Sequence, residues 1–174
     1  MPPATPHLRL VTPGSVPDAE HAYRTYSAYV AAIALHLLGR DNEVDDVVQD
    51  VFLAGMRGLS SLREPGAIKG WLATVTVRMC MSRLKRRRLR SFLDLDSATE
   101  NDIASTSPDP AERLMLARVY AVLDELSPKE RVPWILHHVD GETLPVVATL
   151  CACSLATIKR RIAAAQHEIE ARLG

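Results

Sequence analysis

Apolar residues recur at steps of three and four along most of this chain, and no stretch shows the strict alternation of a half-buried strand. The first such stretch predicts a helix over residues 18–38 that is closed by Gly39. Six further stretches predict helices over about 41–59, 71–90, 111–126, 127–139, 143–151 and 155–173. The pattern therefore predicts an all-α fold.

Residues 91–110 interrupt the helical pattern. They are acidic, rich in Ser, Thr and Asp, and broken by Pro108 and Pro110, which is typical of a linker. A chain of 174 residues with 47% hydrophobic residues can form one ordinary domain or two small ones. We expect a disordered N-terminal tail (1–17), a helical bundle (18–90), a flexible, hinge-like linker (91–110) and a second small helical domain (111–174).

The net charge of zero conceals a strong sorting of charges along the chain. Residues 41–62 hold five acids and one base, residues 63–90 hold nine bases and one acid, and residues 91–112 hold six acids and no base. Because salt screens charges beyond roughly 10 Å, the basic block can bind a polyanion locally. A solvated charged surface is the other reading of the same block.

The predicted helix over 41–59 has two different faces. Its core face is the apolar stripe Val44, Val47, Val48, Val51, Phe52, Gly55 and Leu59. On the opposite face, Leu53 lies among Asp46, Gln49, Asp50 and Arg57. This leucine is either a stray surface residue or the anchor of a protein-docking surface.

The predicted third helix is apolar around most of its circumference, so it should pack on more than one side. It ends in a run of cations, namely Arg83, Lys85, Arg86, Arg87, Arg88 and Arg90. Because the rest of the helix should be packed on several sides, its cationic end should be held in a fixed position.

The last two predicted helices form a helix-turn-helix pattern. Thr143 should cap the first of them, Ala152 and Cys153 form the turn, and Ser154 should cap the second. Cations near the start of the second helix are placed where base edges and phosphates would be met. Such geometry also occurs in helical bundles that do not bind DNA.

Upstream, Ser127, Pro128 and Glu130 predict a capping box, and Pro133 should bend the helix that follows.

Taken in order, these segments resemble the extracytoplasmic-function type of RNA polymerase sigma factor. The run Asp45 to Leu53 resembles the polymerase-docking helix of sigma region 2, and Gly70 to Val75 resembles the part of region 2 that opens and reads the minus-ten element. Leu126 to Arg131 and the helix-turn-helix resemble region 4, which reads the minus-thirty-five element. The resemblance covers about residues 20–173, with no domain between the two regions.

The resemblance implies a cytoplasmic, non-enzymatic initiation factor whose partners are core RNA polymerase, promoter DNA and an anti-sigma factor. It implies that polymerase is bound by Asp45, Asp46, Gln49, Asp50 and Leu53. The minus-ten DNA contacts would be Arg63, Lys69, Arg78, Arg83, Lys85, Arg86, Arg87 and Arg88. The minus-thirty-five contacts would be Ser154, Leu155, Ala156, Thr157, Lys159, Arg160 and Arg161.

Three features depart from the family pattern. Ala152 occupies a turn position where relatives usually carry Gly, so the turn should be either strained or differently wound. The last helix continues with alanines where relatives are often richer in Arg, and residues 63–68 replace a more usual aromatic-containing run. The promoter preference of relatives is therefore not transferable.

Other readings are an enzyme, a sigma-like adaptor that does not initiate transcription, and a metal sensor. We find no phosphate loop, no nucleophile with a base and no carboxylate cluster with metal-like context, so we expect no cofactor and no resident metal. Four residues could be Zn ligands, but small packed cysteines are the preferred explanation for two of them; the four are His137, His138, Cys151 and Cys153. No apolar run approaches the length of a membrane span, no secretory signal is recognisable, and three cysteines argue against a disulfide scaffold.

Overall fold

The computed structural model describes residues 19–58, 64–93 and 109–173, and over these ranges it is helical and contains no β-strand, as the sequence predicted. The first group of helices comprises α1 (Ala19–Leu38), the 3-10 helix η1 (Asp41–Glu43), α2 (Val44–Gly58), the 3-10 helix η3 (Pro65–Ala67) and α3 (Ile68–Phe92). The second group comprises α4 (Pro110–Glu125), α5 (Pro128–His138), α6 (Leu144–Leu150) and α7 (Leu155–Leu173). The predicted tail (1–17), most of the predicted linker (94–108) and Arg63 lie outside the described residues.

Most helix ends follow the local chemistry read from the sequence. α1 ends where Gly39 adopts a φ of +70°, a conformation that glycine reaches without a Cβ clash. The Glu130 carboxylate accepts from both the amide and the hydroxyl of Ser127, and the Ser154 hydroxyl accepts from the Thr157 amide. Thr143 is an exception to the prediction, because its side chain accepts no capping hydrogen bond from the first turn of α6. The first turn of α6 is closed by backbone bonding from Val147 to the Thr143 carbonyl instead.

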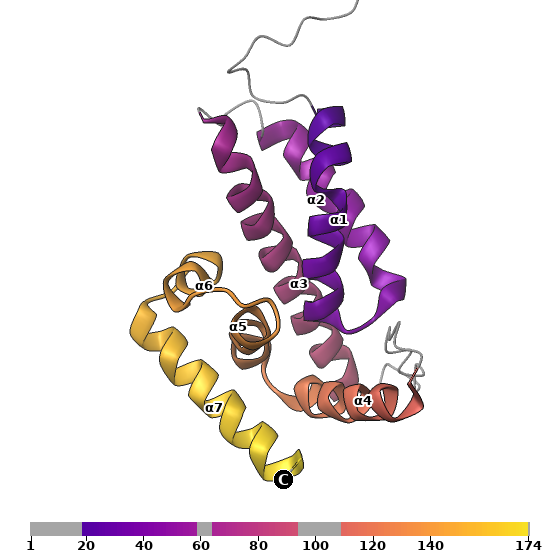
Figure 1. Cartoon of the computed structure of the whole chain (residues 1–174), viewed down its shortest axis with the longest axis vertical. Coiled ribbons are helices and arrows are strands. Elements are labelled where there is room, and N and C mark those ends of the chain that lie inside the picture. Colours follow the sequence, from indigo (N-terminus) through magenta and orange to yellow (C-terminus); the bar gives the residue numbers. More distant parts are fainter. Residues whose placement is uncertain (1–18, 59–63, 94–108, 174) are drawn as a thin grey trace, which may run out of the picture.

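The helices α1, α2 and α3 lie side by side along their lengths, and the C-terminal ends of α1 and α3 meet the N-terminal end of α2 at one end of the bundle (Figure 1). Each contributes an apolar stripe to the interior, including Val30, Leu37, Val47, Val51 and Leu72 at no more than 1% exposure. As its all-round apolar sequence predicted, α3 packs on more than one side: it contacts α1 and α2, and also α5 and α6.

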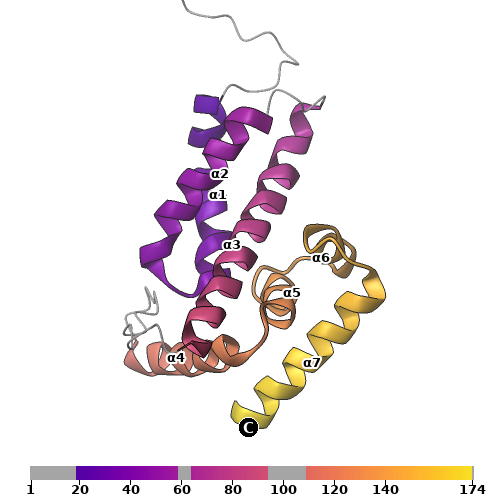
Figure 2. The ribbon, with the colours of Figure 1, turned by 180° about the vertical axis from the view of Figure 1, so that it is seen from behind.

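The second group closes that end of the bundle. Figure 2 shows from behind that α4 lies across the end of α3, with α5 between α3 and α7. α5 contacts α1, α3, α6 and α7, and the buried residues of both groups form one continuous apolar cluster. The two groups of helices correspond to the two helical domains that the sequence predicted, and in the structure their buried residues share a core. Within the described residues, no helix is both long and apolar enough to cross a membrane.

The turn between α6 and α7 carries the backbone strain that its sequence predicted. Ala152 has a φ of +51°, and it is the one non-glycine residue with a positive φ in the described ranges. The left-handed region brings Cβ close to the following carbonyl oxygen, which costs roughly 1–2 kcal/mol for an L-residue. The backbone conformation at Ala152 therefore lowers the stability of the helix-turn-helix.

Substitution Ala152→Gly should raise the free energy of unfolding by about 1 kcal/mol, because glycine adopts this φ without the Cβ clash. Urea unfolding followed by circular dichroism measures the change. The matched control is Ala163→Gly at an exposed position inside α7, where the same replacement should lower stability by about 1 kcal/mol. Equal or lower stability of Ala152→Gly would show that the turn is not strained.

Candidate functional site

The residues that the sequence placed opposite the core stripe of α2 lie on its outward face in the structure. Asp45, Asp46, Gln49 and Asp50 are exposed, while the valines of the opposite stripe are buried. Leu53 lies on the same outward side with 53% of its surface exposed. An acidic surface with one apolar knob on a rigid helix can bind a partner that offers cations around an apolar pocket.

A cation from α3 reaches this acidic surface. The Arg83 guanidinium lies 2.7 Å from Asp50 Oδ2 and 4.0 Å from Asp46 Oδ2. A residue expected to contact DNA is thus paired with two residues expected to contact polymerase. Because the Asp50 and Asp46 side chains are at least half exposed, the pairs are worth little in stability and can exchange for other partners.

The basic end of α3 divides into two sets of side chains. Lys85, Arg86 and Arg90 are exposed, whereas Arg87 is half-buried and held by three acceptors. Its guanidinium lies 2.6 Å from Glu43 Oε1, donates to the Leu38 carbonyl at 3.3 Å and lies 3.8 Å from Asp124 Oδ1. Arg88 donates to the Glu125 carbonyl at 3.3 Å. The run of cations is therefore not one uniform phosphate-binding cluster, since Arg87 and Arg88 already have partners within the chain.

The other residues expected near the minus-ten element lie nearer the start of α3. Arg78, Arg83 and Arg86 line a shallow hollow of about 410 Å3 together with Asp50, Val75, Met79 and Ser82. Lys69 lies 4.7 Å above the centre of the Tyr29 ring, close enough for a cation–π contact. Three guanidinium groups and one carboxylate line this hollow, and one of the guanidinium groups is paired with that carboxylate, so the lining keeps a net positive charge that can attract an anion.

The start of α7 presents the surface expected to read DNA. Ser154, Leu155, Ala156, Lys159 and Arg160 are exposed there. Thr157 is half-buried, and its hydroxyl contacts that of Ser154 at 2.9 Å. Arg161 turns back and donates to Cys153 Sγ at 3.4 Å. The outward cations at this helix start are therefore Lys159 and Arg160.

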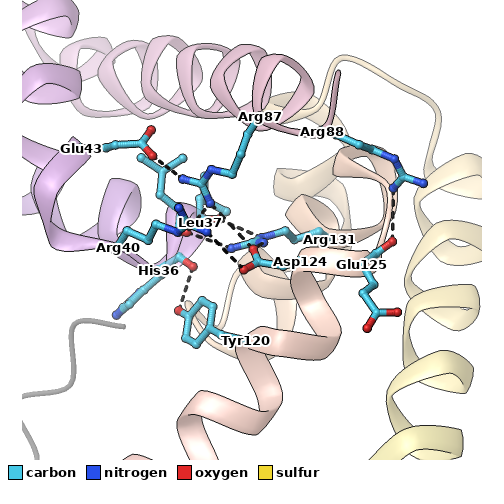
Figure 3. A network of polar contacts seen from close by, with 11 residues as sticks. His36, Leu37, Arg40, Glu43, Arg87, Arg88, Tyr120, Asp124, Glu125 and Arg131 are labelled. Atoms are coloured by element: carbon cyan, nitrogen blue, oxygen red, sulfur yellow. Dashed lines mark hydrogen bonds and ion pairs between the residues drawn. The ribbon is translucent and has the colours of Figure 1, made fainter. Parts of the chain in front are cut away.

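Sequence reasoning missed a polar network at the C-terminal end of α1, shown in Figure 3. Arg131 of α5 is 2% exposed, donates to the carbonyls of Leu37 and Leu38 at 3.0 Å each, and is paired with Asp124. Burial lowers the pKa of Arg131, and the Asp124 carboxylate acts in the opposite direction. The last carbonyls of a helix have no partner within it, so a cation at this place satisfies both their hydrogen bonding and the helix dipole.

Two further contacts join the helix groups around this network. Tyr120 of α4 packs its ring against Gly39 and donates its hydroxyl to the His36 carbonyl at 2.9 Å. His36 Nδ1 lies 2.5 Å from Asp140 Oδ1. Burial raises the pKa of Asp140, and the hydrogen bond from His36 opposes that shift. The one sequence signal for the network was an arginine at helical spacing from two apolar residues, Pro128 three positions before it and Ile135 four positions after it, both of which are buried in the structure.

The residues weighed as Zn ligands do not come together. Within residues 19–58, 64–93 and 109–173, no group of three or more His, Cys, Asp or Glu side chains is placed to hold a metal ion. Burial raises the pKa of Cys80 to about 12 and that of Cys151 to about 12, so neither thiol is a ready nucleophile or ligand at neutral pH. The His138 ring instead lies 5.0 Å from that of Trp134.

Comparison with known proteins places this architecture among bacterial transcription proteins. The family described as Sigma-70 region 2 matches residues 22–90. The chain is 28% identical over 155 residues to the "Probable ECF RNA polymerase sigma factor SigI" of Mycobacterium tuberculosis, covering 85% of this chain and 53% of that protein. It is 30% identical over 144 residues to the RNA polymerase sigma factor CnrH of Cupriavidus metallidurans, covering 76% of this chain and 74% of that protein. The chain thus spans about half the length of SigI.

A solved structure shares the fold. The sigma factor RpoE of Bartonella quintana, in complex with the anti-sigma factor NepR, superimposes with a TM-score of 0.66. The alignment covers 88% of this chain and 95% of that chain at 22% identity. Because the identity is low, this likeness concerns the arrangement of the helices.

Substitution Gly39→Ala tests whether the network requires the close approach of α4. A Cβ at this position would lie 2.4 Å from Tyr120 Cδ1, and the φ of +70° disfavours any L-residue. We expect the free energy of unfolding to fall by about 2 kcal/mol or more in a urea titration. Gly70→Ala is the matched control, since nothing lies within 4 Å of its Cβ and a helical alanine should stabilise by about 0.5–1 kcal/mol. Wild-type stability of Gly39→Ala would contradict this packing.

Proposed function

This chain belongs to the extracytoplasmic-function type of RNA polymerase sigma factors, and we propose that it binds core RNA polymerase and directs it to promoters. Residues 18–90 would bind polymerase and the minus-ten element, and residues 111–174 would bind the minus-thirty-five element. Residues 91–110 would connect the two. No catalytic role is proposed.

One observation carries the proposal: a single chain holds two exposed surfaces of different character. The acidic face of α2, with Leu53 at its centre, is suited to a protein partner. The start of α7 presents Lys159 and Arg160 from the second helix of a helix-turn-helix, which is suited to the major groove. An initiation factor has to bind a polymerase and a duplex at the same time, and these surfaces lie on different helices.

The DNA contacts would divide by their chemistry. The exposed Lys85 and Arg86 are suited to phosphates, which carry no sequence information. Arg78 and Arg83 would meet DNA through the hollow on α3. Arg87 and Arg88 could join them only after leaving Glu43, Asp124 and the Glu125 carbonyl.

Control by an anti-sigma factor and action in the cytoplasm are part of the proposal. The fold shared with RpoE, whose structure was solved in complex with the anti-sigma factor NepR, supports the first. The second follows from the need to reach polymerase and chromosomal DNA.

A sigma-like adaptor that binds polymerase without initiating transcription is the second candidate. It is favoured by the sparse cations of α7, where the exposed Ala163 and Ala164 follow the recognition segment and Arg161 turns toward Cys153. Run-off transcription with added core polymerase separates the two functions. A promoter-dependent transcript supports the sigma factor, and polymerase binding without any transcript from a promoter library supports the adaptor.

Substitution Leu53→Arg should weaken binding to core polymerase by about tenfold or more, because it places a charge where an apolar anchor enters the partner. The fold should be retained, since Leu53 is 53% exposed and faces away from the core. Fluorescence anisotropy with labelled protein measures the affinity. Leu114→Arg on α4, at 64% exposure, is the matched control and should bind like the wild type. Unchanged affinity of Leu53→Arg would remove this surface from the interface.

Two double substitutions should separate phosphate contacts from base contacts in the assembled holoenzyme. Lys85→Ala with Arg86→Ala should flatten the slope of log affinity against log salt by about 1.8, at about 0.9 for each phosphate neutralised, on all promoters alike. Lys159→Ala with Arg160→Ala should instead reduce the difference in binding free energy between the cognate upstream element and a scrambled one. The expected loss is about 1–3 kcal/mol for each side chain that makes two hydrogen bonds to a base edge.

The control for both is Arg113→Ala with Arg118→Ala, two exposed cations of α4 outside either surface, which should change neither quantity. If the α3 pair altered promoter choice while the α7 pair altered only the salt slope, the two assignments would be reversed.

A further inference from the structure

A small cavity lies between α1 and the segment that runs from α5 to α6. Its volume is about 160 Å3. Three of its walls are the aliphatic side chains of Ile33, Leu136 and Leu150, which are buried, whereas Ala32 at its edge is exposed. The cavity is therefore apolar inside and can be reached from solvent. Its full lining is Tyr29, Ala32, Ile33, Leu136, Asp140, Glu142 and Leu150.

One carboxylate oxygen in this cavity lacks a partner. Asp140 Oδ1 lies 2.5 Å from His36 Nδ1, whereas Asp140 Oδ2 is buried and has no hydrogen bond to any of the described residues. The side chain as a whole is only 12% exposed. A buried carboxylate oxygen without a partner costs free energy, so a hydrogen-bond donor that enters the cavity gains by binding there.

The charges around the cavity favour a donor that is a cation. The carboxylates of Asp140 and Glu142 line it, and among the described residues no Lys or Arg does. Burial raises the pKa of Tyr29, and the negative charges of Glu142 and Asp140 act in the same direction. Lys69 lies 4.7 Å from the centre of the Tyr29 ring but is not part of the lining. The potential inside the cavity is therefore negative.

The walls decide which kind of cation fits. Within the described ranges, no group of three or more His, Cys, Asp or Glu side chains is placed to hold a metal ion. Hard metal cations need about six or more oxygen ligands, which this lining does not offer. The aliphatic walls can instead take a short hydrocarbon chain, since apolar surface gains by leaving water. An apolar cavity of about 150 Å3 accepts a molecule of the size of benzene, so a short alkyl chain fits in this one.

We propose that the cavity is a binding site for a small aliphatic ammonium ion, the protonated form of a primary alkylamine. The ammonium group donates to Asp140 Oδ2 and lies near the Glu142 carboxylate, while the alkyl chain packs against Ile33, Leu136 and Leu150. The site does not depend on the proposed function, because the free chain forms it. Bound amine stabilises the folded chain, since the unfolded chain has no such cavity.

The probe is n-butylammonium chloride, titrated into the isotope-labelled full chain while the amide chemical shifts are followed by NMR. The control ligands are 1-butanol, which has the same chain without the charge, and KCl at equal ionic strength. Asp140→Asn removes the charge, and Ala32→Leu fills the edge of the cavity while both carboxylates remain. Asp41→Asn and Ala163→Leu are the matched controls, because they make the same replacements at exposed positions outside the cavity.

We expect saturable shifts at residues 29–33 and 140–142, with a dissociation constant on the order of 1 mM for a ligand of so few atoms. Asp140→Asn should weaken binding by about tenfold or more, because it removes a charge-assisted hydrogen bond. Ala32→Leu should weaken it by a similar factor, and 1-butanol should bind about tenfold more weakly than the amine. Asp41→Asn and Ala163→Leu should bind like the wild type.

Shifts that never saturate would show that the cavity holds only water and would overturn the proposal. Wild-type affinity of Asp140→Asn would overturn it too, and so would equal shifts with 1-butanol or KCl. Circular dichroism shows whether each variant keeps its helix content. If Asp140→Asn loses helix, Ala32→Leu decides alone, and wild-type affinity of that variant would place the amine outside the cavity.

Discussion

The burial of one guanidinium group constrains the rest of this molecule. Arg131 is 2% exposed, and a buried cation is strongly destabilising unless it is paired and hydrogen-bonded. Its partners are Asp124 from α4 and the last carbonyls of α1, and those carbonyls have no acceptable partner within their own helix. Each group therefore depends on the others, so the end of α1, the end of α4 and the start of α5 must assemble together.

The surfaces that the sequence predicted to bind partners are unequally exposed. The acidic face of α2 and the start of α7 are exposed, whereas Arg87 is held by the Leu38 carbonyl, Glu43 and Asp124, and Arg88 donates to the Glu125 carbonyl at the end of α4. In this arrangement Leu53 is exposed, while two of the cations that the sequence predicted to contact DNA already have partners within the chain.

Most helices could be predicted from the sequence because they depend on local spacing and capping. The contacts between distant segments could not be predicted in this way. The spacing of apolar residues in α7 predicted the bounds that the structure shows, Leu155–Leu173. Ala152 stands where a glycine is usual, and its φ is positive in the structure. The third helix begins earlier than its apolar run, at Ile68, and the Thr143 hydroxyl does not cap α6. A run of cations in the sequence also does not show which of them form ion pairs within the chain, because the acceptors of Arg83 and Arg87 belong to other segments. Arg131 is the clearest case, since its carbonyl partners lie 93 and 94 residues away.

The two tryptophans provide the most direct measurement of whether the halves form one unit, because Trp71 belongs to α3 and Trp134 to α5. Trp134→Phe leaves fluorescence that reports on the first group, and Trp71→Phe leaves fluorescence that reports on the second. In a urea titration, each fluorescence curve should coincide with the loss of helix measured by circular dichroism on the same variant, because the shared core and Arg131 make unfolding a single transition. Loss of helix in two steps, with Trp71 following one and Trp134 the other, would contradict a single cooperative unit.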